Sequence, residues 1–238
     1  MRVLVLSADF AALDAAGLNL HAVLDLADLP PQVVADLRRD FAPAHACRQI
    51  ILIGNAGRAL WTALRAAGSE SADPIDDFSV RTVMQWFAAQ FPGHRCTLLY
   101  PGDKPVGLQA LGRLAGWHQP TPFKLGILPQ WGSWFGYRAA LLADTELAPT
   151  APLRMPSPCA SCAGRPCVAA CPAQAMADGE FLLDKCARYR LQPDSRCRTT
   201  CVARDACPVG REHRYDEEQV RHSYSVSLRA IEQYCRPA

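Results

Sequence analysis

The stretch CASCAGRPCVAACP spans residues 159–172, and a second stretch, CRTTCVARDACP, spans residues 197–208. Each places several cysteines a few residues apart and ends in the dipeptide Cys-Pro. With Cys186 between them, these stretches hold eight of the 11 cysteines in the chain. The other three are scattered along the chain: Cys47, Cys96 and Cys235.

This spacing is typical of a chain that holds two iron–sulfur clusters. The two-cluster ferredoxin run is C-x2-C-x2-C-x3-C-P, and its fourth cysteine ligates the other cluster. A cubane needs four converging thiolates, and a short loop supplies only three of them. The same crossing here predicts two [4Fe–4S] clusters, one held by Cys159, Cys162, Cys167 and Cys207, the other by Cys171, Cys186, Cys197 and Cys201.

Two other interpretations of the cysteines are zinc sites and structural thiols. Zinc also accepts four thiolates, but the Cys-Pro endings and interleaved spacing are not those of zinc ribbons. A secreted disulfide scaffold would normally follow a signal peptide, and the apolar run in residues 1–6 is too short for one. We therefore expect a cytoplasmic protein. Nearby arginines would offset the negative charge of the clusters or form a solvated face: Arg165, Arg188, Arg190, Arg196, Arg198 and Arg204.

The composition is that of an ordered globular chain. Its 238 residues are 50% hydrophobic and 20% charged, and the formal net charge is +2. No apolar run approaches the ~20 residues of a membrane span. A charge so near neutral gives no reason to expect a nucleic-acid or membrane partner.

Prolines at 149, 152, 156 and 158 mark a domain boundary, because a helix or central strand does not accommodate them. We expect an α/β domain over residues 1–153, a ferredoxin-like domain over 154–212 and a C-terminal helix in 213–238 that packs back on the first domain. In the first domain, hydrophobic periodicity predicts helices at 31–41, 59–67, 76–91 and 105–117, and strands at 49–53, 96–100, 125–128 and 134–143. The fold class is α+β.

Two further stretches carry a family resemblance. Residues 114–117 (LAGW) and 126–135 (GILPQWGSWF) resemble the corrinoid-binding core of epoxyqueuosine reductase and of CblC-type cobalamin-processing proteins, and residues 212–219 (EHRYDEEQ) resemble the C-terminal segment of the CblC type. The cysteine module is arranged as in epoxyqueuosine reductase and reductive dehalogenases. The resemblance implies a flavin-reductase-like or nitroreductase-like sandwich that binds cobalamin, and two [4Fe–4S] clusters that feed it electrons.

The same resemblance implies the other site residues. The corrinoid would be contacted by Leu128, Trp131, Gly132, Ser133, Trp134 and Phe135, although the aromatic ones also suit the core of a hairpin. Leu128 stands where the CblC type has a histidine. Asp103 falls, one residue out of register, where epoxyqueuosine reductase has its general acid, although an aspartate here also suits a turn.

We therefore expect an iron–sulfur oxidoreductase that delivers electrons through its clusters to a bound corrinoid, for reductive chemistry or cobalamin processing. Its partners would be a low-potential electron donor, such as a flavodoxin, a ferredoxin or a reductase, and a small-molecule or corrinoid substrate. The alternative is a ferredoxin-type electron carrier whose α/β domain binds a protein partner and no corrinoid.

Overall fold

The computed structural model describes residues 7–41, 46–68 and 71–235. The chain divides into two compact units, of which the first contains Met1–Trp117 and Phe135–Arg154. The second contains His118–Trp134 and Met155–Ala238. The boundary after residue 154 lies one residue from the expected one, but the chain also enters the second unit earlier, between residues 118 and 134.

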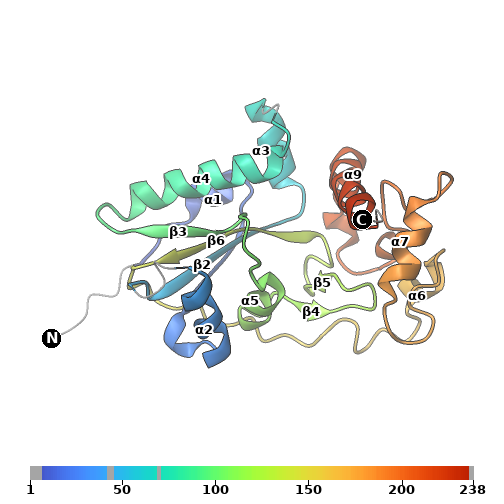
Figure 1. Ribbon diagram of the computed structural model, residues 1–238, viewed down its shortest axis with the longest axis horizontal. Coiled ribbons are helices and arrows are strands. Elements are labelled where there is room, and N and C mark those ends of the chain that lie inside the picture. Colours follow the sequence, from blue (N-terminus) through green and yellow to red (C-terminus); the bar gives the residue numbers. More distant parts are fainter. Residues whose placement is uncertain (1–6, 42–45, 69–70, 236–238) are drawn as a thin grey trace. The chain divides into compact units, whose positions relative to one another are not determined.

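A four-stranded antiparallel sheet forms the centre of the first unit (Figure 1). Its strand order is β1-β2-β6-β3, and the strands are β1 (Leu20–Asp25), β2 (Gln49–Ala56), β6 (Phe135–Ala143) and β3 (Cys96–Tyr100). All eight residues of β2 are buried, because β1 and β6 flank it and helices cover its faces. The β-branched run at its centre suits such a strand.

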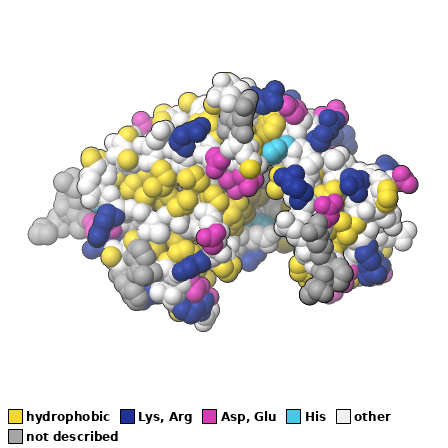
Figure 2. Space-filling view, turned by 45° about the horizontal axis from the view of Figure 1, so that its top comes forward, with side chains coloured by type: hydrophobic (Ala, Val, Ile, Leu, Met, Phe, Trp, Pro, Cys, Tyr) yellow, Lys and Arg dark blue, Asp and Glu magenta, His cyan; other side chains and the backbone are white. Residues whose placement is uncertain are grey.

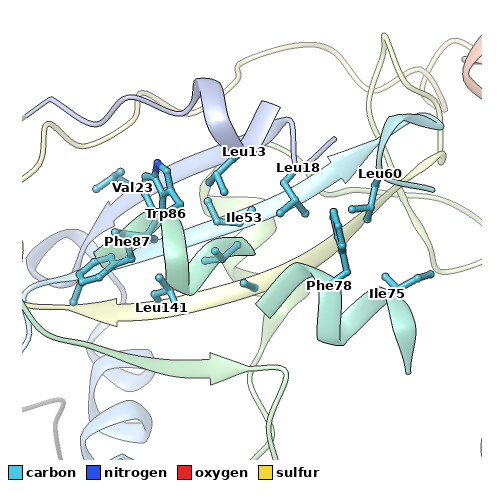
Figure 3. Packing of buried hydrophobic residues seen from close by; sticks show 14 of the residues in the cluster. Leu13, Leu18, Val23, Ile53, Leu60, Ile75, Phe78, Trp86, Phe87 and Leu141 are labelled. Carbon is cyan, nitrogen blue, oxygen red and sulfur yellow. The ribbon is translucent and has the colours of Figure 1, made fainter. Parts of the chain in front are cut away.

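Helices cover both faces of this sheet, as Figure 1 shows. On one face lie α1 (Ala11–Ala15), α3 (Ala59–Ala67) and α4 (Pro74–Gln90), and on the other lie α2 (Pro31–Asp40) and α5 (Leu108–Leu114). A short 3-10 helix, η1 (Leu26–Asp28), follows β1. Figure 3 shows the core on the α4 side, where Phe78, Trp86 and Phe87 of α4 belong to one buried cluster with Ile53 of β2 and Leu141 of β6. The first unit is thus a mixed α/β fold with a small antiparallel sheet.

Most predicted elements of this unit are confirmed. The strand at 96–100 and the helix at 59–67 have the expected bounds, and the latter ends at Gly68, whose φ of 65° closes the helix. The helix expected at 105–117 is shorter, since it begins only at Leu108. The expected strands at 125–128 and 134–143 do not form a hairpin: the first pairs with β4 in the second unit, and β6 pairs with β2 and β3.

The second unit consists of short elements linked by loops. A two-stranded sheet, β4 (Gln119–Pro120) and β5 (Gly126–Ile127), is followed by α6 (Pro166–Ala170), α7 (Leu183–Leu191), α8 (Val202–Asp205), η3 (Arg211–His213) and α9 (Glu217–Tyr234). Asp216 caps α9 by accepting a hydrogen bond from the Gln219 amide at 2.8 Å. This helix packs against α7 and groups with the second unit. That it also packs back on the first domain stays a prediction.

Charged side chains of both signs are interspersed over the face shown in Figure 2, in line with the near-neutral net charge. Among the described residues, no helix is both long and apolar enough to cross a membrane.

Candidate metal centre

Short helices and the turns around them position the clustered cysteines. Cys167 lies in α6, which begins at a proline, and Cys171 ends that helix. Cys186 lies within α7. Cys201 is the N-cap of α8, and its Sγ accepts a hydrogen bond from the Arg204 amide at 3.4 Å. These four cysteines therefore lie in short helices or at their ends, whereas Cys159, Cys162, Cys197 and Cys207 lie in the turns and loops around them.

The first group of thiols gathers around Cys159. Burial raises the pKa of the Cys159 thiol, and the neighbouring Cys207, Cys167 and Cys162 raise it further. The pKa of Cys167 is raised by burial and then by Cys207. Cys207 thus returns from the second Cys-Pro stretch to join the loop of the first. We call Cys159, Cys162, Cys167 and Cys207 the first site.

The second group gathers around Cys186. Burial, followed by the nearby Cys201, raises the pKa of Cys186 to about 11, and Cys171 and Cys197 add to this effect. All four thiols line one cavity of about 330 Å³. Its remaining walls are largely apolar and include Phe123, Met176 and Phe181. We call Cys171, Cys186, Cys197 and Cys201 the second site.

These two groups are the sets expected from the crossing of ligands, with Cys171 and Cys207 exchanged between the two Cys-Pro stretches. No three histidine, cysteine or acidic side chains converge on the position of a single ion anywhere in the described ranges. That the two sites hold clusters stays a prediction.

The chemistry of both donor sets fits an iron–sulfur cluster. A thiol becomes a thiolate when it binds metal, so the raised pKa values mean that protons leave these buried sulfurs as the cluster binds. Four thiolates around a cubane form a net anion, which requires nearby positive charge. Arg190 lines the cavity of the second site and favours the thiolate forms of Cys186 and Cys197.

The expected corrinoid-contacting segment begins with a closed turn. Leu128 and Gly132 exchange two backbone hydrogen bonds, at 2.9 and 2.8 Å. Gly132 has a φ of 60°, and a Cβ atom there would lie 2.1 Å from the carbonyl oxygen of Val209. This glycine therefore permits a close approach of two segments within the second unit, and not an approach to a ligand.

The side chain of Arg204 contacts the next two residues, Ser133 and Trp134. The Oγ of Ser133 accepts a hydrogen bond from Arg204 Nε at 3.2 Å, and its carbonyl oxygen accepts one from Nη2 at 2.5 Å. The Trp134 side chain is 1% exposed, with Arg204 over its ring and the edge of Tyr215 beside it. Trp134 is therefore core of the second unit and has no face free for a corrinoid.

The remaining expected site residues are more open. Trp131 is half-buried with its ring 4.2 Å from that of His213, and Phe135 is half-buried against Tyr137. Asp103 is exposed in the bend between β3 and α5. Since Leu128, Gly132, Ser133 and Trp134 are all buried within the second unit, this segment does not fit a corrinoid floor.

Sequence reasoning missed the importance of two residues near the cysteines. Arg190 and Arg204 are both 6% exposed, although the pattern alone could not separate them from their four neighbouring arginines. Tyr224 of α9 contributes a wall of the second site, and burial raises the pKa of its hydroxyl. The only sequence signal for either arginine was its place near a ligand cysteine.

The scattered cysteines lie apart from both sites. Burial raises the pKa of Cys96 to about 11, with contributions from Cys47 and Asp144, and Cys235 is exposed.

No family model and no curated protein matches the sequence. Among solved structures, the chain is similar to epoxyqueuosine reductase from Streptococcus thermophilus, with a TM-score of 0.52 at 15% identity over 85% of this chain and 67% of that one. A structure of epoxyqueuosine reductase with a tRNA-Tyr stem loop gives 0.55 at 14% identity, over 87% and 66%. A reductive dehalogenase, described with a mechanism for B12-dependent dehalogenation, gives 0.52 at 12% identity, over 91% and 33%.

The chain therefore has the mixed α/β fold that these reductases share. It spans about two thirds of the length of the epoxyqueuosine reductase structures and a third of that of the dehalogenase. Because one neighbouring structure holds a tRNA stem loop, the expectation of no nucleic-acid partner has no support. The resemblance to CblC-type proteins stays a prediction.

Proposed function

We propose that this protein is an iron–sulfur redox protein whose second unit holds two [4Fe–4S] clusters in a ferredoxin-like arrangement. The observation that carries the proposal is the gathering of eight cysteines into two groups of four, in which each Cys-Pro stretch contributes one cysteine to the group of the other. Two separate zinc sites would not require that exchange, because each stretch could close around its own ion.

In this proposal the clusters store and transfer single electrons, and the chain provides their surroundings. The thiols of both sites release protons on binding, and the apolar walls of the second site exclude water. Arg190 and Arg204 contribute positive charge beside the second site. An external low-potential donor, such as a flavodoxin, a ferredoxin or a reductase, would supply the electrons.

We further propose a corrinoid as the electron acceptor and a flavin-reductase-like or nitroreductase-like role for the first unit. The support is the fold shared with the dehalogenase and epoxyqueuosine reductase. Since four of the six residues expected to contact the corrinoid are buried within the second unit, we assign it no residue of that segment and no step. A substrate, whether a small molecule or an epoxyqueuosine-type tRNA, would be bound by parts of the chain other than residues 128–135.

The alternative is a ferredoxin-type carrier that binds a protein partner and no corrinoid. The packing of Trp134 under Arg204 favours it, because the aromatic segment then has a purely structural role. Both functions share the clusters and differ only in the acceptor.

The first experiment is metal analysis of full-length protein purified without oxygen. We expect about eight iron and eight sulfide per chain. A Cys162→Ser variant should lose cluster signal, whereas Cys235→Ser, at an exposed cysteine outside both sites, should not. Zinc in place of iron, or only four irons, would overturn the two-cluster proposal.

The second experiment titrates this holoprotein with cob(II)alamin and follows the visible absorbance. Saturable binding at micromolar concentrations supports the corrinoid acceptor. If intact clusters are present and no binding occurs at high micromolar cobalamin, the ferredoxin-type alternative replaces it.

A further inference from the structure

We propose that Arg190 and Arg204 are the buried counter-ions of the second site and make it the higher-potential cluster of the two. This inference rests on the proposed function, because it presumes that both sites hold clusters. It adds a direction: electrons entering the protein collect at the second site.

Arg190 is buried with neutral partners only. Its Nε donates to the carbonyl oxygen of Cys197 at 3.0 Å, and Nη1 and Nη2 donate to Ser227 Oγ and the Tyr224 carbonyl, both at 2.9 Å. Its Nη2 also donates to the Arg198 carbonyl at 3.4 Å. The guanidinium thus spans from a ligand cysteine to helix α9, and none of these acceptors carries a charge.

Arg204 is surrounded in a similar way. Its guanidinium donates to both oxygens of Ser133 and lies over two aromatic rings, 4.0 Å from the centroid of Trp134 and 5.1 Å from that of Tyr215. Its backbone amide donates to the Cys201 sulfur, and its charge favours the thiolate form of that cysteine. Within the described residues, no ion pair joins a carboxylate to either arginine.

A buried charge without an opposite charge is strongly unfavourable. Hydrogen bonds and ring faces offset part of the desolvation of a guanidinium, but they supply no net negative charge. The anionic cluster of the second site would supply that charge, because Arg190 lines its cavity and Arg204 contacts its ligand Cys201. The two arginines and the cluster would then stabilise one another.

In the part of the chain that the structure describes, no buried arginine acts on Cys159 or Cys167 of the first site. The arginine whose charge acts on Cys159 is Arg165, and that side chain is exposed. Water screens an exposed charge, so Arg165 stabilises extra negative charge at the first site far less than a buried guanidinium does.

Reduction adds one negative charge to a cluster, so a buried positive charge favours the reduced form and raises the potential. Transfer of one electron from the first site to the second is then downhill. The first site is oxidised by one electron, the second is reduced by one, and no proton or further reactant is required.

The test is a redox titration of anaerobically prepared full-length protein, read by electron paramagnetic resonance. A Cys171→Ser variant identifies which signal belongs to the second site. In the wild type, we expect the second-site signal to develop at the higher potential. Arg190→Gln should lower the ratio of reduced to oxidised cluster at that site at least tenfold at fixed potential, which is 59 mV for a one-electron couple.

Arg190→Lys keeps the charge and should retain most of the wild-type potential. Arg188→Gln is the matched control, since Arg188 lies on the same helix but is exposed, and it should leave both potentials unchanged. Equal lowering by Arg190→Gln and Arg190→Lys would show that the charge is not the cause and would overturn the proposal.

Should Arg190→Gln fail to hold its second cluster, the wild type still decides: a second-site potential at or below that of the first overturns the inference. Iron and sulfide content distinguishes a failure of the proposed function from a failure of the inference about the order of potentials. Wild-type protein without clusters contradicts the proposed function, whereas intact clusters with the opposite order contradict only this inference.

Discussion

The guanidinium of Arg204 lies 4.0 Å from the centroid of the Trp134 ring, and the two side chains bury each other. Arg204 lies three residues after Cys201 of the second site, while Trp134 belongs to the segment that resembles a corrinoid-binding string. Their contact ties this segment to the cysteine module. Trp134, which the sequence suggested as a corrinoid contact, therefore packs against an arginine of the candidate cluster site.

Trp134→Ala should destabilise the second unit. Removal of a fully buried tryptophan costs about 3–5 kcal/mol of unfolding free energy, and here it also uncovers Arg204. Chemical denaturation of the reconstituted protein measures the loss, and iron retention reports its effect on the clusters. Trp131→Ala is the control, because Trp131 is only half-buried, and it should cost much less. Equal losses would contradict the role given to Trp134.

Gly132→Ala should destabilise the same unit through its backbone. The added Cβ would lie 2.1 Å from the Val209 carbonyl oxygen, and the φ of 60° is unfavourable for alanine. We expect a loss of about 1–3 kcal/mol, measured by thermal or chemical unfolding. Gly164→Ala tests the specificity, since Gly164 lies in the cysteine loop with open space around it. A wild-type stability for Gly132→Ala would refute the close approach.

Exchange of ligands between the two stretches has a spectroscopic consequence. Cys171→Ser and Cys201→Ser should alter the same paramagnetic signal, because both thiols line the cavity of the second site. Cys162→Ser should alter the other signal, although Cys162 lies closer in sequence to Cys171. Matching changes in Cys171→Ser and Cys162→Ser would show instead that each stretch binds its cluster locally.

Stability should fall in alkaline solution partly through Cys96, a thiol outside both sites. Its pKa is about 11 in the folded chain against 9.0 for an unperturbed thiol, chiefly because of burial. Between these values the unfolded chain has lost a proton that the folded chain retains, so rising pH favours unfolding. Its contribution is full below pH 9 and is lost as the pH rises through 11.

Urea unfolding of Cys96→Ala from pH 8 to 11 should therefore show a shallower decline in stability than the wild type. Cys235→Ala, which removes an exposed thiol, should follow the wild-type curve. Parallel curves for Cys96→Ala and the wild type would mean that this thiol does not contribute.

Local patterns in the sequence were enough to predict several elements. The apolar run at 49–53 identified β2, and Gly68 marked the end of α3. Strand β1 was missed, because Val23 interrupts its alternation of apolar and polar residues and its burial comes from pairing with β2. The sequence pattern does not reveal which strands pair. The neighbouring strands at 125–128 and 134–143 suggested a hairpin, but residues 126–127 pair with residues 119–120 instead.

The two expected ligand sets follow from cluster geometry, which restricts how ligands from short loops converge, and they stay a prediction. The environment of the aromatic segment could not be predicted from the sequence. The burial of Trp134 depends on Arg204 and Tyr215, which lie far along the chain and show no pattern that links them to it. The special character of Arg190 has the same origin, since its partners, which include residues of α9, distinguish it from the exposed Arg188.

Residues 118–134 belong to the second unit, so the polypeptide crosses between the units three times. The cysteine module therefore cannot be separated as an independent domain by a single cut after residue 154. A fragment of residues 155–238 would lack Ser133 and Trp134, and Arg204 would be left without the residues that bury it. Gene fusion or recombination at that point would separate the ligands from their support, so the two units are expected to be inherited together.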